Sequence, residues 1–425
     1  MLVMGGIIGT GIFMNPYVVA QRVHTPALVL GAWLAGGCIA LTAGFIWAEL
    51  ADRLPSVGGQ YAYLREAYHP IVAFLYGWVL LLVIQTGGMA AVTVTFSRYF
   101  LELSGMHAPD WQVAGIVLTV LTVINCLGVR AGGTVQSALM VLKILAIALL
   151  VFAGAFLVRG HISWKPLLDQ PLSPGLLSSF GAAMIPVVFA YGGWQTATFA
   201  AGEMKDPRRD LPRALVIGVI GVALCYISVN YVCVRALGVT TLENTPTPAS
   251  AVMRLALGSR GATLIALGIA ISTLGFLSQS VLTAPRVYFA MARDGLFFRQ
   301  LAQVHPRTQA PILAIALQSV WTMVILLWGS YDKILNYVVS IDALFWVLTA
   351  GCLFVLRRRQ PTRSAFSMPG HPYTTGIFCV VCSAVVANTI YRFPENSLIG
   401  LAIMAAGVPV YYIWTYNIRK VTSRA

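Results

Sequence analysis

Twelve stretches of the 425-residue chain are long, apolar and almost free of charge, and they constrain the fold more than any other feature. They cover residues 1–20, 27–48, 71–97, 111–129, 134–158, 178–202, 214–234, 261–285, 311–328, 334–356, 374–391 and 398–416. Each is about 18–27 residues long, enough for a helix to cross a hydrocarbon core of roughly 30 Å. Their only charged residues are Lys143 and Asp342. Because barrel strands would be about 10 residues long with alternating polarity, the pattern predicts an all-α membrane protein with twelve transmembrane helices.

The composition agrees with a chain whose main solvent is lipid. Charged residues make up 10% of the sequence and hydrophobic residues 58%, whereas an ordinary soluble domain carries roughly 25% charged residues. No long polar insertion divides the chain, so we expect a single transmembrane domain over residues 1–425.

The net charge of +14 would suit a nucleic-acid-binding protein, but the placement of the charges indicates a membrane topology instead. If Arg53 and Arg65 face the cytosol, alternation of the spans places eighteen basic residues on that side and nine on the other. This asymmetry follows the positive-inside rule and puts both termini in the cytosol. We therefore interpret the basic runs KDPRR and RRR as orientation anchors in a cytoplasmic (inner) membrane, and expect no nucleic-acid partner.

Cysteine and histidine give no sign of a catalytic or metal site. All seven cysteines lie within or at the edges of the apolar windows: Cys38, Cys126, Cys225, Cys233, Cys352, Cys379 and Cys382. The last two have redox-motif spacing but lie in the apolar run GIFCVVCSAVV, where packing is the expected role. The six histidines show no metal-ligand spacing, so we expect no metal, no cofactor and no catalytic residue.

Two of the windows are interrupted by glycine at corresponding positions. The first interruption is GGIIGTGIF (5–13) and the second lies in PVVFAYGGWQTATF (186–199). The two spans are five apart and cross in opposite directions, as an inverted repeat requires. We expect repeats over 1–158 and 178–356, followed by two further helices over 374–418. The alternative is that these glycines only permit close helix packing, since Gly5 and Gly9 have small-xxx-small spacing.

Unwound backbone at membrane depth has to be buried in protein or line a cavity, because each bare polar group costs several kcal/mol in lipid. Half-helix N-termini present N–H groups and a partial positive charge that suit a carboxylate. Freed carbonyls at half-helix C-termini suit an ammonium group. The two interruptions together predict a site for a zwitterion such as an amino acid.

At these residues the sequence resembles the amino acid–polyamine–organocation superfamily, and within it the bacterial relatives of the L-type amino acid exchangers. The motifs that carry the resemblance are GGIIGTGIFMNP (5–16), WAELADRLPSVGGQYAYLREAYHP (47–70), FAYGGWQTATFAAGEMKDPRRDLPRAL (189–215), PRVYFAMARDGLFF (285–298) and HPRTQAPILAIALQS (305–319). The resemblance covers essentially the whole chain. It implies a LeuT-type 5+5 inverted repeat with discontinuous helices 1 and 6.

The resemblance also implies a substrate-binding site between these two helices. Its residues are Gly6, Ile7, Thr10, Gly11, Phe189, Ala190, Gly192 and Gln195. The carboxylate is expected at the N–H groups of Thr10 and Gly11, and the ammonium at carbonyls near Ile7, Phe189 and Ala190. Phe189 would close over the substrate, and Gln195 would help to determine which substrate is bound. Trp194 fits a structural role as well as a contacting one.

Lys143 lies about nine residues into its span, roughly 14 Å deep at 1.5 Å per residue. An unpaired charge there costs at least about 3 kcal/mol. In the exchanger branch a lysine resembling Lys143 fills the place that a sodium ion takes in related folds, where it would bond carbonyls of the first helix and the hydroxyls of Ser272 or Thr273. Sodium-independent transport follows as a hypothesis.

Two acidic residues are candidates for gating or coupling. Asp342 lies about eight residues into its span. Three roles are open for it: carrying protons, pairing with Lys143, or hydrogen bonding between neighbouring helices. We favour a structural or gating role. Glu203 would pair with cytosolic arginines and hold the inward gate.

We expect a secondary active transporter that exchanges neutral amino acids by alternating access, because no acidic or basic residue falls in the inferred side-chain pocket. The alternative is proton-coupled uptake of amino acids or polyamines. The outer loop LELSGMHAPDWQ (101–112) lacks the cysteine through which mammalian L-type exchangers join a glycoprotein, so no disulfide-linked heavy chain is expected. A membrane enzyme or a channel is disfavoured because convergent catalytic groups and rings of pore charge are absent from the sequence.

Overall fold

A computed structural model describes residues 2–55, 58–127, 132–199, 206–306, 310–328, 331–359 and 364–422, and these residues contain helices but no β-strand. The helices are α1 (Leu2–Ile7), α2 (Gly11–Ala20), α3 (Pro26–Arg53), α4 (Gln60–Ala67), α5 (Pro70–Val79), the π-helix η1 (Leu80–Ile84), α6 (Gln85–Ser104), α7 (Asp110–Cys126), α8 (Gly132–Phe156), α9 (Pro174–Tyr191), α10 (Thr196–Phe199), α11 (Pro207–Leu242), α12 (Pro248–Thr283), α13 (Pro285–Arg293), the 3₁₀ helix η3 (Arg299–Ala302), α14 (Ile312–Trp328), α15 (Tyr331–Arg359), α16 (Tyr373–Arg392) and α17 (Pro394–Thr422). The predicted all-α fold class is confirmed.

In the described part of the chain, eight helical segments are long and apolar enough to cross a membrane. They are Pro26–Arg53, Pro70–Ser104, Pro174–Phe199, Arg208–Leu242, Pro248–Arg293, Lys333–Arg359, Tyr373–Arg392 and Pro394–Tyr416. Four shorter apolar helices accompany them: Gly11–Ala20, Asp110–Cys126, Met140–Phe156 and Ile312–Trp328. Each of the twelve predicted windows overlaps a different one of these twelve helical segments. A count of twelve crossings stays a prediction, because four of the segments are shorter than a full span.

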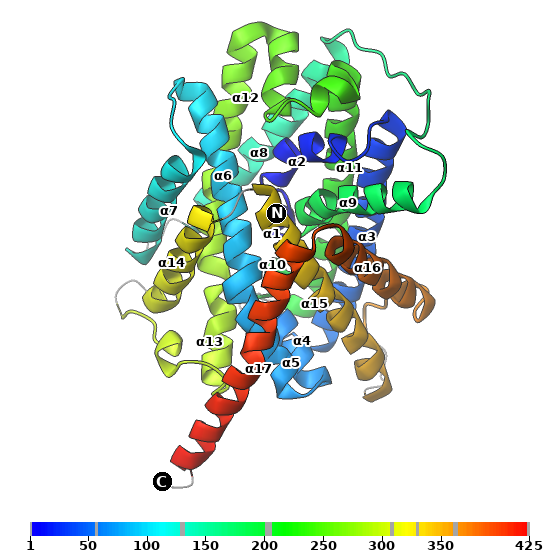
Figure 1. Cartoon of the computed structure of the whole chain (residues 1–425). Helices are drawn as coiled ribbons and strands as arrows, with labels where there is room; N and C mark the ends of the chain where they lie inside the picture. The colour runs from blue at the N-terminus through cyan, green and yellow to red at the C-terminus, as the bar shows by residue number, and fades with distance from the viewer. Residues whose placement is uncertain are drawn as a thin grey trace.

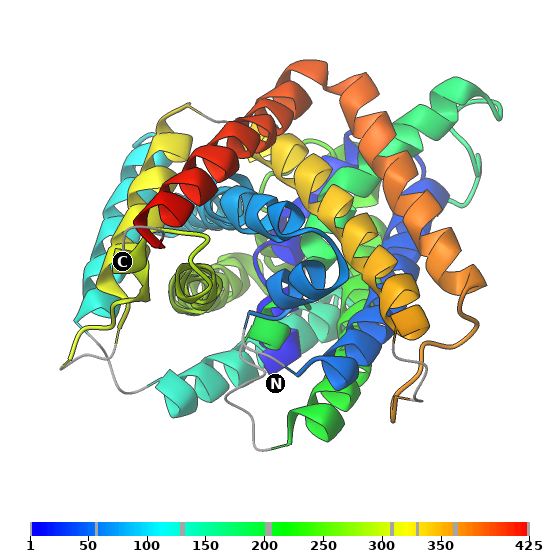
Figure 2. The same cartoon turned by 90° about the horizontal axis from the view of Figure 1, so that it is seen from below.

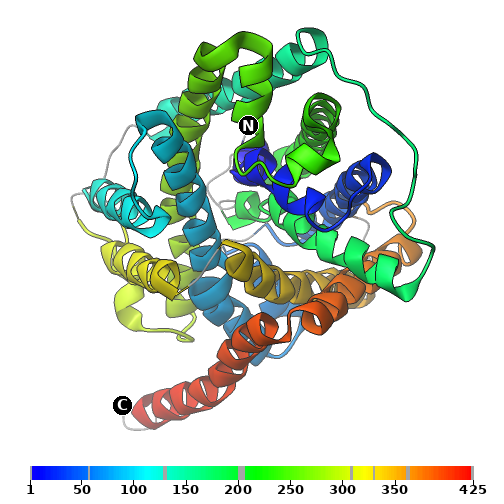
Figure 3. The ribbon, with the colours of Figure 1, turned by 45° about the horizontal axis from the view of Figure 1, so that its top comes forward.

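The helices form a bundle in which the two interrupted segments lie inside and the last helix lies outside. Helix α1 and the N-terminus are near the middle of Figure 1, and α17 leads to the C-terminus at the bottom of that view. From below, α17 runs along the outer edge of the bundle (Figure 2). Helix α2 contacts α9, α11 and α12 (Figure 3). Segments far apart in the sequence therefore meet around α2.

Several helices begin with a side-chain cap followed by proline. The Thr25 hydroxyl accepts from the Leu28 N–H before Pro26 starts α3, and the Ser173 hydroxyl accepts from the Leu176 N–H before Pro174 starts α9. Proline suits the first helical position because the N–H that it lacks has no partner there. These local signals fix where two long apolar helices start.

One end of the bundle, where α4, α5 and α13 lie at the bottom of Figure 1, is held by ion pairs. The fully buried Glu49 accepts from Arg53 at 2.9 Å, from Arg357 at 2.9 and 2.6 Å, and from the Met368 N–H at 2.7 Å. This carboxylate therefore joins α3 to the end of α15 and to the segment before α16.

A second cluster at this end joins α4 to the residue that follows α13. Arg65 forms an ion pair with Asp294, and the Tyr61 hydroxyl donates to the same carboxylate at 2.8 Å. Burial, together with the neighbouring carboxylate, raises the pKa of Tyr61 well above its ordinary value. The phenol therefore stays protonated and keeps donating.

Candidate substrate site

The first interruption separates α1 from α2 and leaves three residues, Ile8 to Thr10, outside both helices. Helix α2 starts at Gly11. In its first turn the Phe13 N–H donates to the Thr10 carbonyl at 3.0 Å, and the N–H groups of Gly11 and Ile12 precede the first acceptor within the helix. The Thr10 hydroxyl is buried and has no hydrogen-bond partner. The segment thus presents several unused donors at one point in the bundle interior.

The second interruption follows α9, which ends at Tyr191, and precedes α10, which starts at Thr196. Gly193 has φ +119°, a conformation that disfavours any residue with a Cβ. Its N–H donates to Gln195 Oε1 at 3.0 Å, and its carbonyl accepts from the Thr196 hydroxyl at 2.7 Å. The polar groups of this segment are partly satisfied by its own side chains.

Pro186 disturbs α9 before this interruption. Proline has no N–H, so the Ala182 carbonyl four residues earlier loses its helical donor, and Arg22 Nη1 donates to that carbonyl at 3.1 Å. The Pro186 carbonyl in turn accepts from Asn15 Nδ2 at 2.6 Å. Two side chains that follow the first interruption in the sequence therefore hold α9 in place before the second.

Glycine lets the two interrupted segments touch through their backbones. A Cβ on Gly193 would lie 2.1 Å from the Gly6 carbonyl oxygen, and one on Gly6 would lie 2.4 Å from Thr196 Oγ1. A Cβ on Gly11 would lie 2.8 Å from the Ala190 Cα. Unwinding and close packing, the two alternatives for these glycines, therefore occur together.

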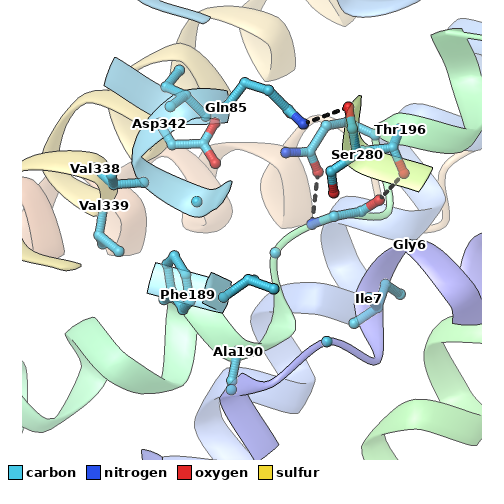
Figure 4. Close-up of a pocket in the computed structure, with 18 of the residues that line it drawn as sticks. Gly6, Ile7, Gln85, Phe189, Ala190, Thr196, Ser280, Val338, Val339 and Asp342 are labelled. Atoms are coloured by element: carbon cyan, nitrogen blue, oxygen red, sulfur yellow. Dashed lines mark hydrogen bonds between the residues drawn. The ribbon is translucent and has the colours of Figure 1, made fainter. Parts of the chain in front are cut away.

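A cavity of about 110 Å³ lies between the interrupted segments and the helices that face them. Its lining comprises Gly6, Ile7, Gly9, Thr10, Gly11, Ile84, Gln85, Gly88, Met89, Val92, Val188, Phe189, Ala190, Gly192, Gly193, Gln195, Thr196, Phe276, Ser280, Val338, Val339, Asp342 and Trp346. All eight residues proposed from the sequence as substrate-binding are in this set. Figure 4 shows Ile7 and Ala190 on one side of the cavity and Asp342 with Gln85 on the other.

Lys143 of α8 approaches the first interruption from outside the cavity. Its side chain is buried, and its ammonium donates to the Ile8 carbonyl and lies 5.5 Å from the centroid of the Phe276 ring. The Thr273 hydroxyl donates to the Ile269 carbonyl of its own helix at 2.7 Å. Among the described residues, no hydrogen bond joins Lys143 to Thr273 or Ser272. The backbone contact expected for this lysine is present, and the hydroxyl contact is not.

Tyr226 of α11 joins the two interruptions, and no sequence pattern marks it because it is one tyrosine in an apolar span. Its hydroxyl lies 3.0 Å from the Ile7 carbonyl and 3.2 Å from the Ala190 carbonyl. These are carbonyls at the C-terminal ends of α1 and α9, where intrahelical donors run out. Since one hydroxyl carries one proton, it cannot donate fully to both carbonyls at once.

The expectation of a pocket free of charged residues is wrong, because Asp342 lines the cavity. Helix α15 presents Val338, Val339, Asp342 and Trp346 to it, a spacing of one face of a helix. Gln85, which was not among the predicted site residues, also lines the cavity. It is the single side-chain amide of the apolar window 71–97, and a polar residue within such a span is a signal for function.

The remaining predicted residues separate into core and undescribed positions. Trp194 is fully buried, packs 4.5 Å from the Trp346 ring and 5.9 Å from the Trp47 ring, and does not line the cavity, which favours its structural role. Glu203 lies outside the described residues. Groups of histidine, cysteine, aspartate or glutamate able to hold a metal ion are absent from the described part of the chain.

Comparison with known proteins gives matches along almost the whole chain. The family model described as "Amino acid permease" matches residues 1–414. The serine/threonine exchanger SteT of Bacillus subtilis (strain 168) is 34% identical over 423 residues, which cover 97% of this chain and 94% of that protein. The large neutral amino acids transporter small subunit 2 of Homo sapiens is 30% identical, with 98% and 79% covered. The cystine/glutamate transporter of Homo sapiens is 27% identical, with 97% and 83% covered.

Proposed function

Because the chain belongs to the amino acid permease family of the amino acid–polyamine–organocation superfamily, we propose that it exchanges amino acids across a membrane by alternating access without sodium. The family and these relatives identify it as a multi-pass membrane transporter rather than an enzyme. Sodium independence and exchange are the parts that require a test.

The observation that carries the proposal is the cavity between two interrupted helices that present main-chain groups of opposite polarity at their ends. The first turn of α2 offers N–H donors to a carboxylate, together with the partnerless Thr10 hydroxyl. At the ends of α1 and α9 the Ile7 and Ala190 carbonyls share one Tyr226 hydroxyl proton, so acceptor capacity remains there for an ammonium group. Phe189 lines the same cavity and is the proposed aromatic gate.

Sodium independence is supported by the position of Lys143. Its ammonium donates to a carbonyl that the first interruption frees, so a tethered cation supplies the charge that a bound ion would otherwise bring to this backbone. We propose that Ser272 and Thr273 border this position on α12, where both are buried.

The proposed architecture is twelve transmembrane helices with inverted repeats over 1–158 and 178–356 and two further helices over 374–418. We place both termini in the cytosol and the protein in the cytoplasmic membrane, on the strength of the positive-inside asymmetry. A disulfide-linked heavy chain is not part of the proposal, since loop 101–112 has no cysteine.

The first choice of substrate is a neutral amino acid, which rests on the main-chain groups of opposite polarity at the two interruptions and no longer on an uncharged pocket. Asp342 favours a second candidate, proton-coupled uptake of amino acids or polyamines, because an acidic group in the cavity wall can bind a proton or a cationic substrate. Glu203 keeps its proposed gating role.

The test uses purified protein in liposomes preloaded with each unlabelled amino acid in turn. Preloading is expected to accelerate entry of the same labelled amino acid, and replacing sodium with choline is expected to leave that rate unchanged. A Lys143→Met variant is expected to lose exchange. No acceleration across the twenty amino acids and the polyamines would refute exchange. Accumulation driven by a pH gradient into empty liposomes would instead establish the second candidate.

A further inference from the structure

Asp342 lies at the side of the cavity opposite Ile7 and Ala190, whose carbonyls suit the ammonium group of a zwitterion (Figure 4). It comes from α15, whereas the interrupted segments come from the first residues of the chain and from α9 and α10. A substrate bound by its carboxylate and ammonium at the interruptions therefore directs its side chain toward Asp342.

This end of the cavity offers hydrogen-bond acceptors. Gln85 Nε2 donates to the Ser280 carbonyl at 3.1 Å, which leaves the amide oxygen of Gln85 as an acceptor on a residue that lines the same cavity as Asp342. No lysine, arginine or histidine is among the described residues that line the cavity. A carboxylate shielded from water needs a proton donor or a cation as partner, and the cavity wall supplies no cation.

The size of the cavity limits how long the side chain can be. An engineered apolar cavity of about 150 Å³ accommodates benzene, and this cavity measures about 110 Å³. Space remains for a side chain of only a few heavy atoms beyond the zwitterion.

We propose that Asp342 is a specificity-determining residue that selects amino acids whose short side chain ends in a hydrogen-bond donor, either a hydroxyl or an ammonium group. Gln85 supplies the second acceptor. The inference rests on the proposed function, since it assumes an amino acid in this cavity.

The experiment measures binding by ligand-induced thermal shift of the purified protein, because a ligand that binds the folded state raises stability as RT ln(1 + [L]/Kd). Three ligands of similar size separate the two donors from an apolar end group: L-serine, L-2,3-diaminopropionate and L-2-aminobutyrate. At least one of the first two is expected to bind at least about 10-fold more tightly than 2-aminobutyrate, as loss of a matched polar contact predicts.

Two substitutions at the same position distinguish the donors. Asp342→Leu removes the acceptor and is expected to abolish the preference over 2-aminobutyrate. Asp342→Asn removes the charge but keeps an acceptor, so it preserves serine binding if the donor is a hydroxyl and weakens diaminopropionate binding at least about 10-fold if it is an ammonium. Ser340→Ala is the control, because Ser340 is buried on the same helix, donates to the Tyr337 carbonyl at 3.0 Å and does not line the cavity.

Equal binding of the three ligands by the unaltered protein, or an unchanged preference in both Asp342 variants, overturns the inference and leaves amino acid exchange standing. No shift with these ligands or any of the twenty amino acids overturns the proposed function and the inference with it.

Discussion

Gly88 offers a way to narrow the cavity without disturbing the fold. It lies on α6 and lines the cavity, and a Cβ at this position would meet no atom within 4 Å. Gly88→Ala therefore places a methyl group in open space. By contrast, substitution of Gly6, Gly11 or Gly193 would force a clash below 3 Å.

The size of the effect follows from the cavity volume. A methyl group fills roughly the volume of one water molecule, about 30 Å³, or about a quarter of the 110 Å³ available. Mismatch by one methylene in a pocket is worth about 1–3 kcal/mol, or about 10–200-fold in kcat/KM. We expect kcat/KM to fall by this factor for the largest amino acid that the protein exchanges, and by less than about threefold for the smallest.

The assay is counterflow in liposomes with the smallest and the largest substrate measured in parallel. Gly376→Ala is the matched control, because Gly376 is a helical glycine on α16 whose added Cβ would also meet nothing and which does not line the cavity. Both substitutions are expected to stabilise their helices by about 0.5–1 kcal/mol. If the ratio of the counterflow rates of the two substrates is the same in Gly88→Ala as in the unaltered protein, the assignment of this cavity as the binding site is refuted.

Two further predictions concern stability, measured by unfolding of the purified protein in detergent. Glu49→Gln is expected to lower the free energy of unfolding by about 3–5 kcal/mol, because it removes a buried carboxylate that pairs with two arginines. Arg254→Ala breaks an exposed pair and is expected to lower it by under about 1 kcal/mol. Equal losses in the two variants would contradict this difference. Burial, and then the nearby Arg357 charge, lowers the pKa of His371, so the unfolded chain binds the proton more readily and stability is expected to fall as the pH drops below the ordinary histidine pKa of about 6.5. His371→Asn is expected to reduce the dependence of the free energy of unfolding on pH below about 6.5. An unchanged slope in this variant would contradict the role given to His371.

The class of fold and the position of the interruptions follow from the sequence. Twelve apolar windows predict membrane helices because lipid leaves main-chain groups no partner outside the helix. GGIIGTGIF and the FAYGGWQ segment predict where helices end, since glycine weakens a helix locally. The helices indeed end at Ile7 and Tyr191. These features depend on neighbouring residues alone, so composition and spacing are sufficient to find them.

Only the tertiary structure decided which side chains from other helices reach the interruptions. Tyr226 is one of many aromatic residues in apolar spans. Its hydroxyl meets the Ile7 carbonyl because α11 packs against α1, and it meets the Ala190 carbonyl because the end of α9 reaches the same point. Asp342 was visible as a charge in a span, but its presence in the cavity depends on the rotation of α15 about its axis. That rotation is set by contacts with distant helices, which no local pattern in the sequence records.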